Sequence, residues 1–201
     1  MWDLIDRVDR TGRPVGGEPV SLDGGDPLTR RMEDCIVLSV DQSSSSRRID
    51  SLGDDAAFRE QRSLWALIES VCTKWGGHVC GWRGDGALAR FGEAASAVEA
   101  ALAIVGGAAG LPRPVGTSPA VLRAGISRGP ALLDQDGHVF GVTLLSAVRL
   151  CAIAPGASIV VTDSMAHTPR IGHRYRLRSV GRVALKGIRE PVGAWDLRRR
   201  R

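Results

Sequence analysis

The chain has 201 residues, of which 43% are hydrophobic and 24% charged, a composition typical of a globular domain large enough to bury a core. Its formal net charge is +5, but arginines 198–201 supply four of these charges and aromatic residues make up only 4%, so a basic nucleic-acid-binding domain is disfavoured. No apolar run approaches the length of a membrane span and the N-terminus lacks a signal-peptide pattern, so we expect a soluble, cytoplasmic protein without a membrane partner.

The first 33 residues differ in composition from the rest of the chain. They are rich in Gly, Pro and Asp and show no sustained hydrophobic period, which predicts a flexible arm or linker. Within this arm, residues 1–8 fit a short helix on a partner surface. The ordered domain is expected over residues 34–197, and residues 198–201 are expected to form a solvated basic tail.

The first half of the expected domain combines a strand, two helices and a hairpin. CIVLSV, which starts at Cys35, has the composition of a buried strand, and DQSSSSRR after it is expected to be a polar loop. Apolar side chains at helical spacing predict an amphipathic helix over residues 55–75, ended by the glycine pair that follows it. A tight hairpin around Gly84-Asp85-Gly86 comes next, and a second helix is predicted over residues 94–105.

The second half contributes more strands and one further helix. The expected elements are a loop at 111–119, a strand at 121–129, a second strand with a turn at 131–141, a helix at 142–154, a strand at 157–163, and two strands at 175–185 and 191–197. The order β-α-β-β-α-β-β-α-β, with the late strands, predicts an α+β fold: a ferredoxin-like, antiparallel-leaning sheet with helices on one face.

The cysteines and histidines point to neither disulfides nor a zinc site. The four cysteines lie far apart with no C-x-x-C pair, three of them fall in apolar runs, and the histidines show no metal-ligand spacing. We therefore expect buried free thiols and a reducing compartment: Cys35, Cys72, Cys80 and Cys151.

Two carboxylates stand at element ends, where chemistry is commonly placed. Asp41 follows the first strand, and Asp85 occupies the tip of the hairpin, although an Asp-Gly turn by itself is mostly a turn former. In a ferredoxin-like sheet these two strands can be neighbours, and two close carboxylates repel each other unless a cation lies between them. Such hard oxygen ligands suit Mg²⁺ or Mn²⁺ together with substrate phosphates, and the serine-rich loop after Asp41 could offer N–H groups to those phosphates.

Four segments in this order resemble the class III nucleotidyl cyclase family, which includes adenylate and guanylate cyclases. They are SVDQSSSS, WGGHV with GDGALARFG, FGVTLLSAVRLCAIAPGASIVVTD, and VALKGIREPVGAWDL. The resemblance spans residues 35–197. SVDQSSSS fits the family's Phe-x-Asp-Ile-x-Gly-x-Thr position by position, though only Asp41 and the final hydroxyl agree with it.

The resemblance implies a cyclase homology domain that acts as a head-to-tail homodimer with active sites at the interface. Asp41 and Asp85, together with Gln42, would hold two Mg²⁺ or Mn²⁺ ions. Arg149 of the opposite subunit would stabilise charge on the α-phosphate, and Lys186 would reach the terminal phosphates of the nucleoside triphosphate. The backbone of the loop would contact the triphosphate: Gln42, Ser43, Ser44, Ser45 and Ser46.

The positions that read base and ribose in adenylate cyclases of this family are changed here. They carry Gly81, His138 and Leu145, so the catalytic half of the pattern is kept and the adenine-reading half is not. Arg83 shares a strand face with Gly81 and could donate to carbonyl oxygens of uracil or guanine, whereas Trp82 on the other face is expected to pack under a helix.

A small cyclase with altered base contacts is similar to the pyrimidine cyclases of Pycsar anti-phage systems. This likeness favours UTP as substrate and cyclic UMP as product. The alternatives are an adenylate cyclase and a degenerate, catalytically silent cyclase-like module. The paired carboxylates favour an active enzyme, because a silent module has no physical need for two close negative charges.

Overall fold

The computed structural model describes residues 31–134 and 137–200. The arm expected at residues 1–33, with the short helix expected at 1–8, therefore lies outside the described residues except for its last three positions. Residues 31–33 belong to the first strand, so the paired sheet begins earlier than the expected start at residue 34.

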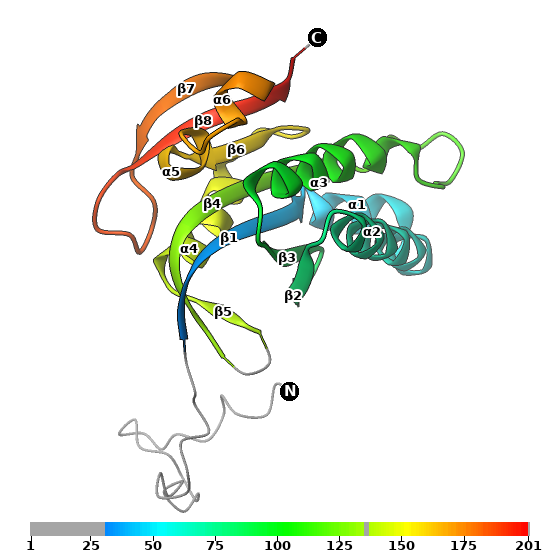
Figure 1. Ribbon diagram of the computed structural model, residues 1–201. Helices are drawn as coiled ribbons and strands as arrows, with labels where there is room; N and C mark the ends of the chain where they lie inside the picture. The colour runs from blue at the N-terminus through cyan, green and yellow to red at the C-terminus, as the bar shows by residue number, and fades with distance from the viewer. Residues whose placement is uncertain (1–30, 135–136, 201) are drawn as a thin grey trace, which may run out of the picture.

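The described residues form one eight-stranded sheet with helices packed against it (Figure 1). The elements are β1 Arg31–Gln42, α1 Ser45–Leu52, α2 Asp54–Lys74, β2 His78–Arg83, β3 Gly86–Phe91, α3 Ala94–Gly107, the 3-10 turn η1 Ala108–Gly110, β4 Leu122–Leu133, β5 Val139–Phe140, α4 Val142–Ile153, β6 Ile159–Thr162, α5 Asp163–Ala166, α6 Ile171–Arg174, β7 Tyr175–Val183 and β8 Val192–Arg199. The strand order is β2-β3-β1-β4-β6-β8-β7, with β5 paired to β4. Only the β4–β6 pair of these strands is parallel, so the predicted antiparallel-leaning α+β fold is confirmed.

The long pair β1 and β4 forms the middle of the sheet. The two strands are antiparallel over twelve residue pairs, from Arg31 opposite Leu133 to Gln42 opposite Leu122. Pairing of this length fixes which residues of the two strands lie side by side, because a shift by one position would turn every side chain to the opposite face.

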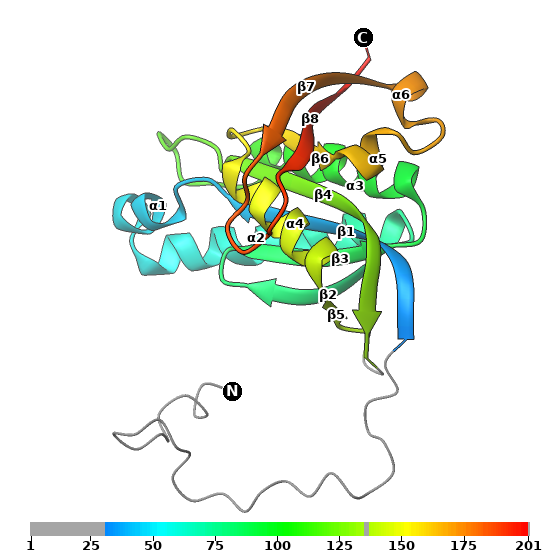
Figure 2. The same cartoon turned by 90° about the vertical axis from the view of Figure 1, so that its left-hand side faces the viewer.

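Helices cover both faces of the sheet, not one face as expected. On one face Ile36, Leu38 and Val40 pack in a core with α2 and α3, whereas Cys35 and Val37 face α4 on the other. Figure 2 shows α4 in front of the sheet with α2 and α3 behind it. The strands are apolar at successive positions because both of their faces are buried, and a one-faced sheet would have alternated with polar residues.

α4 lies unusually close to β4. A Cβ atom added at Gly125 would overlap the carbonyl oxygen of Ala147 and the backbone nitrogen of Cys151. Gly125 therefore allows the helix backbone to rest directly on the strand, and this contact fixes the height of α4 above the sheet.

Two local predictions were wrong. The segment DQSSSSRR is not a loop throughout, because α1 begins at Ser45 inside it. Residues 131–133, expected to start a separate strand, continue β4, and β5 has only two residues. In both places strand pairing and helix packing outweighed the local composition.

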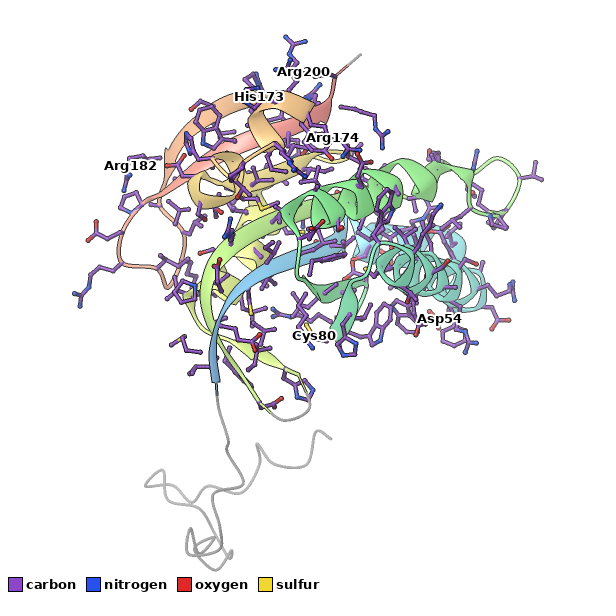
Figure 3. All side chains as sticks on the ribbon, viewed as in Figure 1. Asp54, Cys80, His173, Arg174, Arg182 and Arg200 are labelled. Atoms are coloured by element: carbon purple, nitrogen blue, oxygen red, sulfur yellow. The ribbon has the colours of Figure 1, made fainter. Side chains whose placement is uncertain are left out.

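The arginines at 198–200 are exposed to solvent, yet they do not form a free tail. β8 runs to Arg199, whose Nη2 donates to Oε2 of the buried Glu99 at 2.6 Å. Arg200 donates to the carbonyl oxygens of Tyr175 and Gly172 at 3.3 and 3.1 Å. Figure 3 shows Arg200 beside Arg174, where α6 meets the end of the chain. These arginines are bonded within the fold.

The four cysteines are free, as predicted, and all but Cys80 are buried. Burial raises the pKa of the Cys72 and Cys151 thiols to about 12, so both stay protonated at neutral pH.

None of the helices in the part of the chain that the structure describes combines the length and the apolar character needed to cross a bilayer.

Gly125→Ala should lower the free energy of unfolding by at least about 3 kcal/mol, because the new methyl group meets backbone atoms that cannot move aside. Gly106→Ala is the matched control: it lies in α3 with open space around its Cβ position and should be neutral or stabilising by up to about 1 kcal/mol. Urea denaturation of both variants measures the difference. Equal stability of the two would contradict the close approach of α4 to β4.

Candidate active site

The hairpin β2–β3 places its tip against the end of β1. The last pair of β1 and β3 joins Val40 to Ala87, so the next residues along are Asp41 and Gly86. A Cβ atom added at Gly86 would overlap the carbonyl oxygen of Val40 and come within 3.4 Å of Oδ1 of Asp41. The backbone of the turn at Asp85 is therefore held beside Asp41, but the two side chains line different cavities, Asp41 one on the α4 side and Asp85 one between α1, α2 and the hairpin turn. That the two carboxylates meet stays a prediction.

Arg123 is a site residue that the sequence alone did not reveal. It lies directly opposite Asp41 in the β1–β4 pairing, and its Nε and Nη2 donate to Oδ2 of Asp41 at 3.0 and 2.6 Å. Its Nη1 donates to the carbonyl oxygen of Ala152 in α4 at 2.7 Å. Arg123 thus fixes the orientation of the Asp41 carboxylate, with Oδ1 on the side of Gly86.

A cavity of about 250 Å³ opens between β1, the hairpin and α4. Asp41 and Arg83 line it together, along with Val148 and Ala152 of α4. The residue singled out for base recognition therefore shares a space with one of the two carboxylates. The neighbouring Cys151 also lines this cavity, but its raised pKa leaves it a neutral thiol and a poor competitor for a cation.

Strand β2 divides its side chains as the alternation predicted. Trp82 lies on the α2 side, with its ring centroid 5.7 Å from that of Trp65, but it is 43% exposed and so is not packed under a helix as expected. Arg83 faces the cavity on the α4 side. The pairing of β2 with β3 is irregular between Val79 and Gly81. A Cβ atom at Gly81 would have Leu88 Cδ1 as its nearest neighbour at 4.0 Å, so the space beside Gly81 is open.

The serine-rich segment connects β1 to α1 with a left-handed residue. The backbone N–H of Ser43 donates to the carbonyl oxygen of Val121 at 2.8 Å, and Ser44 has φ 61° and ψ 35°. Ser44 occupies the place of the glycine in the family motif, and glycine is the residue that adopts this conformation without strain. Ser45 and Ser46 belong to the first turn of α1, where backbone N–H groups lack helical acceptors.

Arg149 and Lys186 lie together but outside the cavity that holds Asp41. Arg149 Nε donates to the carbonyl oxygen of Lys186 at 3.1 Å, which joins α4 to the loop between β7 and β8. Leu145, one turn earlier on α4, has its Cδ2 atom 3.5 Å from the Cβ position of Gly187. Neither Arg149 nor Lys186 lines the Asp41 cavity, so these two form a group apart from the strand ends that carry the carboxylates. Asp85 does not line that cavity either: it lines a second one, with Gln42 and Ser45, between α1, α2 and the hairpin turn.

His138 lies in neither group. It stands in the turn between β4 and β5, half exposed, with its Nδ1 2.9 Å from Oδ2 of Asp134. Its backbone N–H donates to Oδ1 of the same carboxylate at 2.8 Å. In the single chain, His138 therefore stabilises this turn through its two contacts with Asp134.

The donor set suits a divalent cation bound by few protein ligands. Within residues 31–134 and 137–200, no group of three or more His, Cys, Asp or Glu residues gathers as a metal site would. Asp41 and the turn of Asp85 lie at adjoining strand ends, and the contact of Gly86 with Asp41 leaves no room for a side chain between the two strands there. Two carboxylates completed by substrate phosphates are the arrangement that Mg²⁺ accepts, so the residues fit this ion.

No protein-family model matches the chain, and none of the curated proteins matches it significantly. Solved structures, by contrast, match the chain over most of its length. The adenylyl cyclase CyaB from P. aeruginosa is 19% identical with a TM-score of 0.75, over 87% of this chain and 98% of that one. The guanylate cyclase domain of RhGC from Catenaria anguillulae, in complex with GTP, is 20% identical with a TM-score of 0.73, over 85% of this chain and 100% of that one.

A third similar structure has a higher sequence identity. The adenylate/guanylate cyclase/hydrolase from Silicibacter pomeroyi is 27% identical with a TM-score of 0.71, over 84% of this chain and 98% of that one. The three alignments span nearly the whole of each cyclase domain and most of this chain. The described domain therefore has the fold of the class III nucleotidyl cyclases, the family that its motifs resemble.

Proposed function

We propose that this chain is a nucleotidyl cyclase that converts a nucleoside triphosphate into a 3′,5′-cyclic nucleotide and pyrophosphate. The observation that carries the proposal is the contact of Gly86 with Asp41, which brings the Asp85 turn beside the first carboxylate. The left-handed Ser44, at the position of the motif glycine, supports it by giving the adjoining loop the backbone course that the motif requires. The likeness to solved cyclase domains adds support.

The reaction needs little covalent chemistry from the protein. The ribose 3′-hydroxyl loses its proton and attacks the α-phosphorus in line, and pyrophosphate leaves. Asp41 and Asp85 would hold two Mg²⁺ or Mn²⁺ ions, with the carbonyl of Gln42 beside them, and these ions would lower the pKa of the hydroxyl and screen the phosphates. Backbone N–H groups of residues 44–46 would bind the triphosphate, since the N–H of Ser43 is already donated to Val121. Arg149 and Lys186 would stabilise the charge that develops on it.

Two subunits are needed to assemble this site. Arg149 and Lys186 are joined by a hydrogen bond at one place on the chain, and Asp41 lines a cavity to which neither contributes. In a head-to-tail homodimer, the Arg149 group of one subunit would meet the carboxylates of the other, and two equal sites would form. A guanylyl cyclase domain from Blastocladiella emersonii has been solved both as a non-canonical dimer and as a monomer, so it supports dimerisation of such a domain but not the head-to-tail geometry.

The substrate favoured by the side chains is UTP. Arg83 lines the cavity with Asp41, and its guanidinium can donate to the carbonyl oxygens of uracil or guanine but not to the adenine amino group. The resemblance to pyrimidine cyclases favours uracil of these two. Gly81 leaves the neighbouring space open. With cyclic UMP as its product, the enzyme would serve as the signal generator of an anti-phage system, as the resemblance to Pycsar cyclases implies.

A catalytically silent cyclase-like module is the second candidate, and one contact favours it. Arg123 occupies Oδ2 of Asp41 with two hydrogen bonds, so a cation must bind through the other oxygen or displace the guanidinium. The apolar Leu145 beside Gly187 likewise offers no polar contact to a nucleotide. A direct assay separates the two candidates.

Purified protein incubated with each of the four nucleoside triphosphates and Mn²⁺ should release a cyclic nucleotide, with cyclic UMP in excess, as measured by mass spectrometry. Asp85→Ala should abolish the product because it removes one of the two carboxylates. Glu69→Ala, which removes an exposed carboxylate of α2, should leave it unchanged. The cyclase proposal fails if no triphosphate is cyclised. Cyclic AMP as the only product would reject UTP, and unchanged selectivity in Arg83→Ala would reject its role in reading the base.

Two inactive variants should complement each other. Mixed Asp85→Ala and Arg149→Ala chains form dimers in which one site carries both changes and the other carries neither. Because half of the randomly assembled dimers are mixed, the activity should recover to roughly a quarter of the wild-type rate. An equal mixture measured after subunit exchange gives this value, each variant alone being the control. Lack of recovery despite confirmed exchange would contradict a site shared between subunits.

Ser44→Gly should raise the free energy of unfolding by about 1 kcal/mol, because it removes the left-handed strain of a residue with φ 61°. No capping hydrogen bond is lost with the side chain. Thermal or urea denaturation measures the change, and Ser63→Gly, in the helical interior of α2, should destabilise instead. Destabilisation by Ser44→Gly would show that the loop does not take this conformation.

A further inference from the structure

A buried carboxylate lies behind the serine-rich loop. Glu60, in the second turn of α2, is only 5% exposed. Arg48 of α1 donates to both of its oxygens, with 2.5 Å between Nη2 and Oε2, and Gln42 Nε2 donates to Oε1 at 3.3 Å. We call Gln42, Arg48 and Glu60 the polar triad. It connects β1, α1 and α2 through one carboxylate.

The polar triad is a strongly bonded unit. A carboxylate that loses its water must be paired and hydrogen-bonded, and Glu60 receives both from the two-pronged guanidinium of Arg48. The hydrogen bonds that Arg48 donates to Glu60 raise the pKa of Arg48, against the opposing effect of burial, so the guanidinium keeps its charge. Loss of one member would leave the others buried without partners, and the three positions are therefore coupled.

The triad holds the serine-rich loop at both of its ends. Gln42 is the last residue of β1, and Arg48 lies in the first turn of α1, so the loop and the start of the helix run between them. Both side chains converge on Glu60, which belongs to a different helix. The N–H groups of residues 44–46 keep their direction only if these two ends stay in place.

Packing supports this loop only in part: the Ser43 hydroxyl is buried and lies near Gly156, but an open space lies beside α1. A cavity of about 760 Å³ opens between α1, α2 and the turn of the β2–β3 hairpin, and the three residues of the polar triad line it together with Trp65 and Asp85. Where a protein interior is filled, many weak contacts hold each segment. Beside this open space, the few hydrogen bonds of the polar triad must hold the loop and the start of α1 instead.

The hydrogen bond from Gln42 to Glu60 is not a feature of the cyclase motif. The family motif has Ile at the position of Gln42, so its side chain offers no hydrogen bond to a carboxylate. In this chain the amide of Gln42 is buried, at 6% exposure, and its partner is Glu60.

We propose that Glu60 is a positioning residue for the triphosphate: by holding Gln42 and Arg48, it sets the backbone of residues 42–48 against which the phosphates bind. This inference rests on the proposed function, and it adds a residue on α2 that touches neither the substrate nor the carboxylates. The loop transmits its effect to the phosphates.

Glu60→Gln tests the proposal, because it keeps the shape of the side chain and removes the charge that holds Arg48. Binding is measured by titration calorimetry with 3′-deoxy-UTP and 3′-deoxy-ATP in the presence of Mn²⁺, since these analogues lack the attacking hydroxyl and cannot be cyclised. The dissociation constant for the analogue that binds wild type should rise on the order of tenfold as the loop loses its position. Arg59→Met is the matched control, because the adjacent Arg59 is 73% exposed and makes only a 4.0 Å ion pair with Asp55, and it should leave binding unchanged.

A merely structural role gives a different result. In that case Glu60→Gln melts at a lower temperature but binds the analogue as wild type does wherever it is folded, and this outcome overturns the proposal. Arg48→Lys provides a second variant if Glu60→Gln does not fold. It keeps the charge, gives up the two-pronged geometry, and should weaken binding by a smaller factor.

Failure of the proposed function can be told apart from failure of this inference. If wild type binds an analogue but cyclises no triphosphate, the cyclase proposal fails and the binding comparison still decides the role of Glu60. If wild type binds no nucleotide, hydrogen exchange of residues 42–48 decides it. Faster exchange confined to that segment in Glu60→Gln supports the inference, and exchange equal to wild type overturns it.

Discussion

The antiparallel pairing of β1 with β4 is the constraint on which the rest of the domain depends. Its twelve residue pairs set Arg123 opposite Asp41 at one end, and they carry Gly125 to the place where α4 rests on the sheet. The hairpin then adds to the other edge of β1 and brings Asp85 to the same end. Both carboxylates and the arginine that orients one of them are therefore products of strand register, which leaves little freedom for the site to form in another way.

Much of the fold could be predicted from local pattern, because helical spacing and turn glycines act over a few residues. The helical spacing of Leu64 and Ile68 predicted α2, and the Gly-Asp-Gly turn predicted the hairpin. Contacts between distant segments could not be predicted in this way. Arg123 lies 82 residues from Asp41, and no local pattern says that the two will pair. That helices cover both faces of the sheet could not be predicted for a related reason: burial of the second face by α4 depends on a backbone contact at Gly125.

The candidate site shows the same division between local and distant information. Motif order singled out Asp41, Asp85 and Arg149 as candidates, and the contact of Gly86 with Asp41 brings the backbone of the Asp85 turn to the end of β1. The composition of the serine-rich segment predicted a loop, but α1 begins within it at Ser45. Arg48 of α1 is hydrogen-bonded to the carboxylate of Glu60 on α2. A buried ion pair between two helices stabilises a segment whose own residues are weak helix formers.

The two sides of the sheet differ in how much they can move. On the α4 side, the missing side chain at Gly125 lets backbone touch backbone, so helix and strand can shift only as one body. On the opposite side, α1 borders an open space of about 760 Å³ and is attached through a few polar bonds. Any tightening around a bound molecule would thus be taken up by α1 and its loop, with α4 serving as the fixed frame. The missing methyl group of Gly125 thus makes α4 the more firmly attached of these two helices.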